Sequence, residues 1–136
     1  MPNFVYNGAA EGAWKGEIDW VSDDMRALLI DTTLYTAAVT DGFLDEIPGG
    51  AIIASAVALG GKTISGRTLQ TTNPITFPTV AVGNDVTAIV VYLHTGTPST
   101  SRLVLYVDTA FGLPAVRDGL DVRVSWSTGT NKIVRF

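Results

Sequence analysis

The feature that most constrains the fold is a series of short β-branched and apolar segments separated by glycine and proline. Valine, isoleucine and threonine account for 41 of the 136 residues. Branching at Cβ suits the pleated surface of a strand and restricts χ1 in a helix. The 14 glycines and 6 prolines are spread along the chain, where they favour turns. Short strands joined by turns predict a mainly β protein, either a β-sandwich or a barrel-like domain.

Seven segments have the composition of strands. Residues 86–93 are apolar on both faces, which is typical of a central strand, and residues 121–126 alternate between apolar and polar side chains. Gly60 and Gly61 predict a two-residue hairpin, Gly66 predicts a bulge, and the Thr- and Pro-rich residues 68–78 predict an irregular connection. The predicted strands are 25–31, 51–59, 62–69, 86–93, 102–108, 121–126 and 131–136.

Two short helices are expected in addition. Asn7 is a suitable N-cap for a helix over residues 8–15, and Gly16 is a suitable stop. A one-turn helix is predicted over residues 41–47, ended by Pro48. The whole chain, residues 1–136, is therefore predicted to be a single β-rich domain with a short N-terminal helix.

Charge and composition narrow the classes of function. The net charge is −4, which gives no electrostatic attraction to nucleic acid, and the absence of cysteine excludes thiol catalysis and zinc–thiolate sites. The most apolar run, residues 51–59, is shorter than the roughly 20 residues of a membrane span. Charged residues make up only 16%, with a mean hydropathy of +0.29. This balance favours a homo-oligomer or another assembly component whose surface is covered by protein.

No motif predicts a catalytic, cofactor or metal site, so we expect a non-enzymatic protein. Residues 56–63 resemble a phosphate-binding loop, but Ala56 replaces the required glycine and residues 64–68 are poor helix formers. The sole histidine, His94, follows the apolar segment 86–93, and nothing in the sequence ties it to a nucleophile. The carboxylates are scattered, and Ser22–Asp24 is expected to form a turn.

The aromatic residues admit two interpretations. They either pack in the core or form a platform on which sugars stack. The residues concerned are Trp14, Trp20, Trp126, Phe4, Tyr6, Tyr35, Tyr92 and Tyr106.

The N-terminal residues 1–6 also admit two interpretations, an edge strand in the chain's own sheet or an arm laid on a neighbouring subunit. An extended strand directs Val5 to the face opposite Phe4 and Tyr6. An edge strand needs only one apolar face, whereas an arm laid on a neighbour buries both. Phe4, Val5 and Tyr6 are therefore interface candidates, and deleting residues 2–6 is predicted to weaken attachment more than stability.

Ordered phrases along most of the chain resemble a group of small tailed-bacteriophage virion proteins, the head or capsid decoration proteins. The phrases lie at residues 3–9, 14–19, 25–29, 43–47, 60–66, 106–109, 112–114, 124–126 and 131–133. The resemblance implies a decoration or cement protein on the capsid exterior, assembled in the host cytoplasm as a dimer or trimer. Its partner would be the major capsid protein.

Two alternatives remain beside that role. One is a tail or head–tail connector component, and the other is a carbohydrate- or host-binding module on the virion. The family has a charged pair before Thr-Gly where this chain has Leu93 and His94. His94 is therefore a further interface candidate, together with Trp14.

Overall fold

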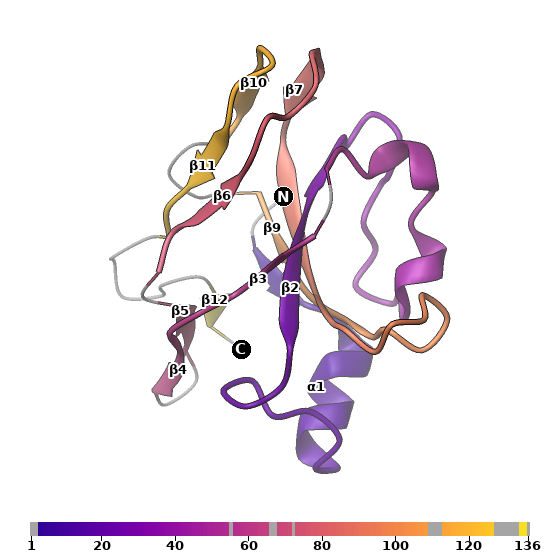
Figure 1. Cartoon of the computed structure of the whole chain (residues 1–136). Helices are drawn as coiled ribbons and strands as arrows, with labels where there is room; N and C mark the ends of the chain where they lie inside the picture. The colour runs from indigo at the N-terminus through magenta and orange to yellow at the C-terminus, as the bar shows by residue number, and fades with distance from the viewer. Residues whose placement is uncertain are drawn as a thin grey trace.

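The computed structural model describes residues 3–54, 56–65, 68–71, 73–108, 113–126 and 134–135, and for the last two only the backbone (Figure 1). The protein is mainly β, as predicted, and is built around an open five-stranded antiparallel sheet whose edges are β1 and β3. In spatial order its strands are β1 (Phe4–Val5), β9 (Leu103–Val107), β8 (Ala88–Leu93), β2 (Met25–Ile30) and β3 (Val57–Ala58).

The strand β8 lies in the middle of this sheet, between β9 and β2, which confirms the central position predicted for residues 86–93. Its residues from Ala88 to Tyr92 are all buried. Successive side chains of a strand point to opposite faces. Both faces of the central strand are therefore covered, and the sheet has a core on each side.

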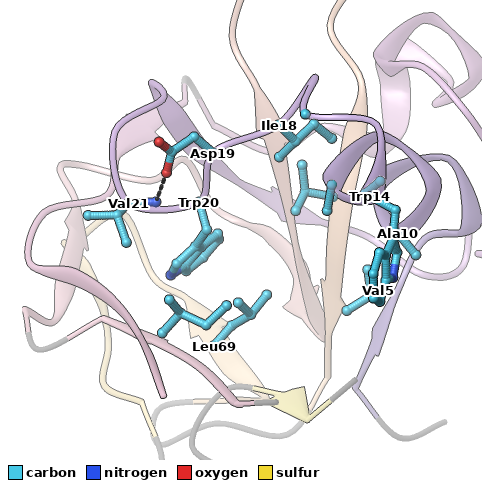
Figure 2. Close-up of a pocket in the computed structure, with 13 residues that line it drawn as sticks. Val5, Ala10, Trp14, Ile18, Asp19, Trp20, Val21 and Leu69 are labelled. Atoms are coloured by element: carbon cyan, nitrogen blue, oxygen red, sulfur yellow. Dashed lines mark hydrogen bonds between the residues drawn. The ribbon is translucent and has the colours of Figure 1, made fainter. Parts of the chain in front are cut away.

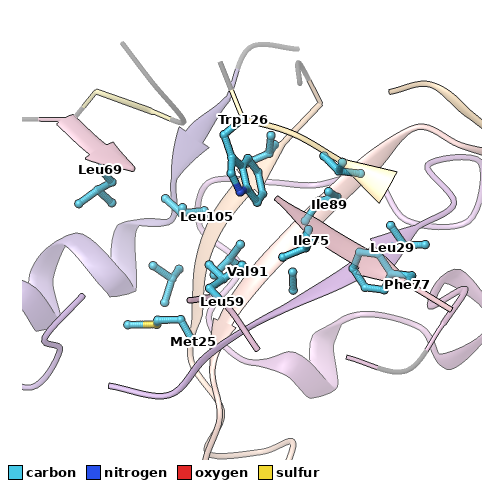
Figure 3. Close-up of a cluster of buried hydrophobic side chains, with 14 of the residues drawn as sticks. Met25, Leu29, Leu59, Leu69, Ile75, Phe77, Ile89, Val91, Leu105 and Trp126 are labelled. Atoms are coloured by element: carbon cyan, nitrogen blue, oxygen red, sulfur yellow. The ribbon is translucent and has the colours of Figure 1, made fainter. Parts of the chain in front are cut away.

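The first of these cores, here called the sandwich core, lies between the five-stranded sheet and a second layer of short strands (Figure 3). Met25 and Leu29 of β2 reach it from the sheet, and Ile75 and Phe77 reach it from the second layer. The second layer contains three small sheets: β6 (Ile75–Phe77) with β11 (Val122–Val124), β7 (Gly83–Val86) with β10 (Ala115–Arg117), and β5 (Thr68–Thr71) between β4 (Lys62–Ser65) and β12 (Val134–Arg135). Val122, Val124 and Trp126 are buried and Arg123 is exposed, which confirms the alternation predicted for β11.

The second core, here called the loop-covered core, lies on the opposite face. Leu28 and Ile30 of β2 contribute to it together with Tyr6, and the covering residues come from segment 35–51. That segment contains two 3₁₀ turns, η1 (Leu44–Glu46) and η2 (Gly49–Ala51). The first lies within the one-turn helix predicted over residues 41–47. There, the Glu46 carboxylate accepts hydrogen bonds from the backbone N–H groups of Gly42 and Phe43.

The predicted N-terminal helix is α1 (Asn7–Trp14). Asn7 was wrongly predicted as its cap: Tyr6 is the N-cap, and its side chain makes no capping hydrogen bond. Burial of Tyr6 positions this end of the helix instead. Gly16 ends the helix in the left-handed region, with φ 77°. Gly12 faces inward, because a Cβ there would lie 2.4 Å from the guanidinium of Arg102.

The predictions for residues 51–78 were wrong in three places. Residues 51–59 contain the last residue of η2 and the short strand β3, which pairs with β2 and not across Gly60–Gly61. Residues 62–69 extend over two antiparallel strands, because β4 pairs with β5. Residues 68–78 contain β5 and β6 and are not irregular. The predicted bulge at Gly66, and residues 131–133 and 136 of the last predicted strand, lie outside the described residues.

Candidate interaction surfaces

An apolar pocket of about 440 Å³ lies between α1, the segment 16–21 and the β4–β5 hairpin (Figure 2). Its walls come from parts of the chain far apart in sequence. They are Val5, Ala9, Ala10, Ala13, Trp14, Gly16, Ile18, Asp19, Trp20, Val21, Ile64, Leu69 and Val104. The pocket is thus bordered by aliphatic and aromatic side chains, with a single carboxylate.

Trp14 lies at the edge of this pocket and leaves 91% of its surface exposed. Ala9 and Gly12 face the interior, so the opposite side of α1 points to solvent. Ala10 and Trp14 lie one turn apart on the side of α1 that borders the pocket, which Ala9 and Ala13 also line. An indole exposed to this degree on a small apolar stripe is a candidate contact, as the sequence predicted for Trp14.

Trp20 holds the other side of the pocket in place. It is nearly buried, and its indole N–H donates to the carbonyl oxygens of Thr63 at 2.9 Å and Gln70 at 3.2 Å. The Asp19 carboxylate accepts backbone N–H groups from Val21 and Ser22, and these hydrogen bonds lower the pKa of Asp19. The segment is therefore fixed to β4–β5 by hydrogen bonds and does not depend on a ligand for its shape.

The second candidate surface is the ribbon of β7 and β10, which projects at the top of Figure 1. It carries three exposed aliphatic residues: Val82, Val116 and Leu120, with 75%, 69% and 67% of their surfaces accessible. Val82 lies beside Gly119, because a Cβ built on that glycine would be 3.9 Å from it. Val82 and Leu120 therefore both adjoin Gly119, and Val116 is exposed on β10. These three residues are called the apolar end of the ribbon below.

Polar contacts hold this ribbon in place. The Asn84 amide donates to the buried carboxylate of Asp31 at 3.1 Å. The Arg117 guanidinium donates to the carbonyl oxygens of Ala81 at 2.9 Å and Asn84 at 3.4 Å. Gly83 leaves room for the guanidinium to cross, since a Cβ there would lie 2.6 Å from it.

Phe4 and Val5, two of the N-terminal interface candidates, form an edge strand in the chain's own sheet. This is the first of the two alternatives, and the other was an arm laid on a neighbouring subunit. Phe4 pairs with Tyr106, and their rings stack with centroids 5.1 Å apart. Tyr6 is completely buried, and its hydroxyl lies 3.0 Å from that of Tyr35. Tyr6 is therefore not accessible as an interface residue. The physical reason is that the sheet is covered on both faces, so Val5 and Phe4 of the edge strand are each partly buried, one against each core.

His94 lies at the start of a polar loop. Its backbone N–H donates to the Asp24 carbonyl oxygen at 2.9 Å, and its ring packs edge-on against Tyr92 with centroids 6.2 Å apart. Beyond it, the hydroxyl groups of Thr95 and Thr100 lie 2.6 Å apart. His94 is partly accessible but lies outside both apolar surfaces.

The aromatic residues mostly follow the core interpretation. Only Trp14 among the eight is strongly exposed. Six of the others are buried: Trp20, Trp126, Tyr6, Tyr35, Tyr92 and Tyr106. A continuous aromatic platform for sugars is therefore not formed by these residues.

The other sequence motifs do not form a phosphate, metal or membrane site in the described residues. Lys62 and Thr63, the end of the phosphate-loop-like sequence, begin strand β4 and not a helix. Across the described ranges there is no cluster of three or more histidine, cysteine or acidic residues that could hold a metal. The helices within those ranges are too short or too polar to cross a membrane.

Sequence reasoning missed Val82, Val116 and Leu120. The available signal was weak: each is an aliphatic residue in a segment rich in glycine and charge. No model of a known protein family matches the chain, and no curated protein matches it significantly.

Proposed function

We propose that this chain is a non-enzymatic structural protein of a tailed-phage virion, which binds the outer face of the capsid as a decoration or cement protein. Its partner is then the major capsid protein. The observation that carries the proposal is the apolar end of the projecting β7–β10 ribbon. The resemblance of the sequence to capsid decoration proteins and the low proportion of charged residues support the same role.

The exposed side chains of the ribbon supply a modest binding energy at each site. Fully burying one large aliphatic side chain contributes about 1.5–3 kcal/mol. Val82, Val116 and Leu120 together therefore provide several kcal/mol before the cost of association is subtracted. A protein that binds only the mature lattice stabilises it by the binding free energy, repeated at every site.

The hydrogen bond that Asn84 donates to Asp31 and those that Arg117 donates to Ala81 and Asn84 make the ribbon a suitable docking element. Because they fix the ribbon against the body of the protein, less conformational entropy is lost on binding. An ordered ribbon with an apolar end can therefore bind a preformed groove of the shell.

A second candidate, a carbohydrate-binding module, is favoured by one observation only, the exposed Trp14 ring. Sugar recognition also needs polar groups that fix the orientation of the ligand. The one carboxylate that borders the same pocket, Asp19, already accepts two backbone N–H groups. The apolar walls of the pocket suit a hydrocarbon or aromatic group better.

The test uses virions of the phage that encodes the chain. We expect on the order of several hundred copies per virion, whereas about six or twelve copies, the number expected of a cyclic ring, would support a connector or tail component. Capsids lacking the protein are then mixed with the purified chain, and bound protein is measured by sedimentation. Glycan-array binding tests the carbohydrate-binding alternative.

Two variants identify the surface. V116D combined with L120D should lower capsid occupancy at least about tenfold, because two charges are placed in an apolar contact. L34D is the matched control, since Leu34 is also exposed but lies away from the ribbon. Circular dichroism confirms that each variant is folded. Failure of the wild-type chain to bind any virion particle would overturn the function, and unchanged binding of the ribbon variant would overturn the docking surface.

A further inference from the structure

We infer that Asn7 is a site of spontaneous modification, at which the side-chain amide is lost through a cyclic imide formed with the backbone nitrogen of Gly8. This inference concerns the chemistry of the chain itself and does not depend on capsid binding. It rests on three observations: the residue that follows Asn7, the hydrogen bonds of the described asparagines, and the position of Asn7 at the start of α1.

The reaction needs only the chain and water. The backbone nitrogen of Gly8 attacks Cγ of Asn7, so that an N–Cγ bond forms and the Cγ–Nδ2 bond breaks. The amide nitrogen leaves as ammonia and takes the proton of the Gly8 nitrogen with it. Water then opens the imide. Addition of water at Cγ gives aspartate in the original chain, and addition at the main-chain carbonyl carbon of Asn7 gives isoaspartate, in which the chain runs through Cβ and Cγ.

The residue after Asn7 hinders this attack least. Gly8 has no side chain beside the attacking nitrogen, and its backbone rotates more freely than that of any other residue. A Cβ built on Gly8 would meet only the Arg102 side chain, at 4.0 Å, so the surroundings do not crowd it. Among the hydrogen bonds of the described residues none is donated by the Gly8 N–H, as is usual in the first turn of a helix. The nitrogen is therefore available for the reaction.

Two other described asparagines are unsuited to it. Asn73 precedes Pro74, whose nitrogen carries no hydrogen and cannot form the imide. The Asn84 amide donates to the buried carboxylate of Asp31 at 3.1 Å, which holds the side chain in place. Asn84 also precedes an aspartate, whose side chain lies beside the nitrogen that would attack.

Asn3 and Asn7 differ in the same way. The side-chain oxygen of Asn3 accepts the Asp108 N–H at 2.9 Å, and Asn3 precedes the bulky Phe4. Asn7 is exposed, and its side chain forms no hydrogen bond within the described ranges. Asn7 is therefore the described asparagine at which the imide forms most readily.

The place of Asn7 at the start of α1 controls the rate. A helical backbone keeps the Gly8 nitrogen away from Cγ, so the first turn has to open before the attack. This turn is weakly held: α1 has only eight residues, Tyr6 supplies no side-chain cap, and the first turn contains no acidic residue. The ends of helices open at a much lower free-energy cost than the core. We therefore expect the folded chain to react more slowly than the unfolded chain, by about ten- to a hundredfold.

The two products affect α1 in opposite directions. Aspartate places a negative charge in the first turn, where the helix macrodipole stabilises it. Isoaspartate adds one atom to the main chain directly after Tyr6, whose carbonyl oxygen accepts the N–H groups of Ala9 and Ala10 at 3.1 Å. The added atom displaces these N–H groups, so isoaspartate weakens the start of the helix.

Peptide mapping of the aged, folded chain tests the inference. The chain is incubated in warm, mildly alkaline buffer and digested with trypsin, and the peptide that ends at Lys15 is fragmented to separate Asn3 from Asn7. The mass gain from exchange of NH₂ for OH should appear at Asn7 before any other described asparagine. G8A is the matched variant, because it keeps Asn7 and suits the helix. It should slow the conversion about tenfold or more, in the folded chain and in urea alike, because a methyl group then lies beside the nitrogen.

Three results would overturn the inference. One is a mass gain that appears first at Asn3, Asn73 or Asn84. Another is an Asn7 that stays intact in the folded chain after on the order of a hundred half-lives of the unfolded chain. The third is a G8A chain, shown to be folded by circular dichroism, that converts as fast as the wild type.

The variant N7D separates the two products, because it is the aspartate product alone. It should unfold at the same temperature as the fresh wild-type chain or a higher one, and the aged chain should unfold at a lower one. An aged chain with the Tm of N7D would refute the effect of isoaspartate on α1. None of these results bears on capsid binding, which is measured separately.

Discussion

The position of Tyr6 gives the sharpest test of how the N-terminus is used. Its side chain is completely buried in the loop-covered core, and its backbone N–H donates to the Val104 carbonyl oxygen at 3.0 Å. The Tyr6 and Tyr35 hydroxyl groups are hydrogen-bonded, and the Tyr35 hydroxyl also donates to Asp41 at 2.7 Å. Substituting Tyr6 therefore perturbs the fold itself and not only a contact with a neighbour.

The expected magnitudes follow from these contacts. Y6F removes one hydrogen bond while Tyr35 keeps its bond to Asp41, so the loss is about 1 kcal/mol. Y6A also leaves a large cavity, which brings the loss to about 3–5 kcal/mol. For a chain of this length 1 kcal/mol corresponds to about 3–5 °C in Tm. The expected decreases are thus about 3–5 °C for Y6F and about 10 °C or more for Y6A.

Thermal unfolding followed by circular dichroism measures these shifts. W14A is the control, because an exposed aromatic residue one helix away should change the free energy of unfolding by no more than about 0.5 kcal/mol. The control must be measured at a concentration where the chain is monomeric. If Y6A unfolds at the same temperature as the wild-type chain while losing capsid binding, the N-terminus is an attachment arm and the structural argument is refuted.

Three further predictions concern the core, the tyrosine pair and the ribbon. F77A should lower the free energy of unfolding by about 3–5 kcal/mol, because Phe77 is fully buried. V82A should lower it by less than about 0.5 kcal/mol, because Val82 is exposed. Urea denaturation measures both changes. Burial raises the pKa of Tyr35, so stability should be complete below the ordinary tyrosine pKa of about 10 and decline above it; Y35F should flatten that decline in denaturation curves measured up to about pH 11. D31A removes the acceptor for Asn84, so hydrogen exchange of β7 should accelerate while that of β8 stays slow.

The sequence correctly predicted those strands in which the pattern of apolar and polar residues matches the pattern of buried and exposed faces. Residues 86–93 are apolar on both faces, and the resulting strand β8 is covered on both sides. Val122 and Val124 alternate with polar residues, and β11 has one buried face. In both cases the local pattern is sufficient, because the side chains of a strand alternate strictly between its faces.

The strand predictions were wrong where one apolar or threonine-rich run of residues is divided between two structural elements. Ala51 is fully buried although it belongs to a 3₁₀ turn, so burial there does not indicate a strand. In residues 62–71 the chain turns back on itself and pairs β4 with β5, although Gly60–Gly61 provides the stronger turn signal. Tertiary packing determines which of these competing turns is formed.

Trp14 was found as a candidate from the sequence, but its pocket was not. Ile18, Ile64 and Val104 converge there from a loop, the second layer and the central sheet. No spacing in the sequence links these positions, because the contact depends on how β4–β5 packs against α1. The exposed ends of the ribbon were missed for the same reason: Val116 and Leu120 resemble ordinary strand and turn residues until the ribbon is seen to project.

Because both faces of the sheet are covered, the N-terminal residues are no longer the best candidates for contact with a partner protein. The arm hypothesis assumed that an edge strand has one face in water, so that Phe4 and Val5 could not both be buried within one chain. In this fold Val5 packs against the sandwich core while Phe4 packs against the loop-covered core. The apolar N-terminus is therefore satisfied by its own chain. Among the described residues the most exposed large apolar side chains lie instead at Trp14 and on the ribbon, and these two sites can be tested independently because they share no residue.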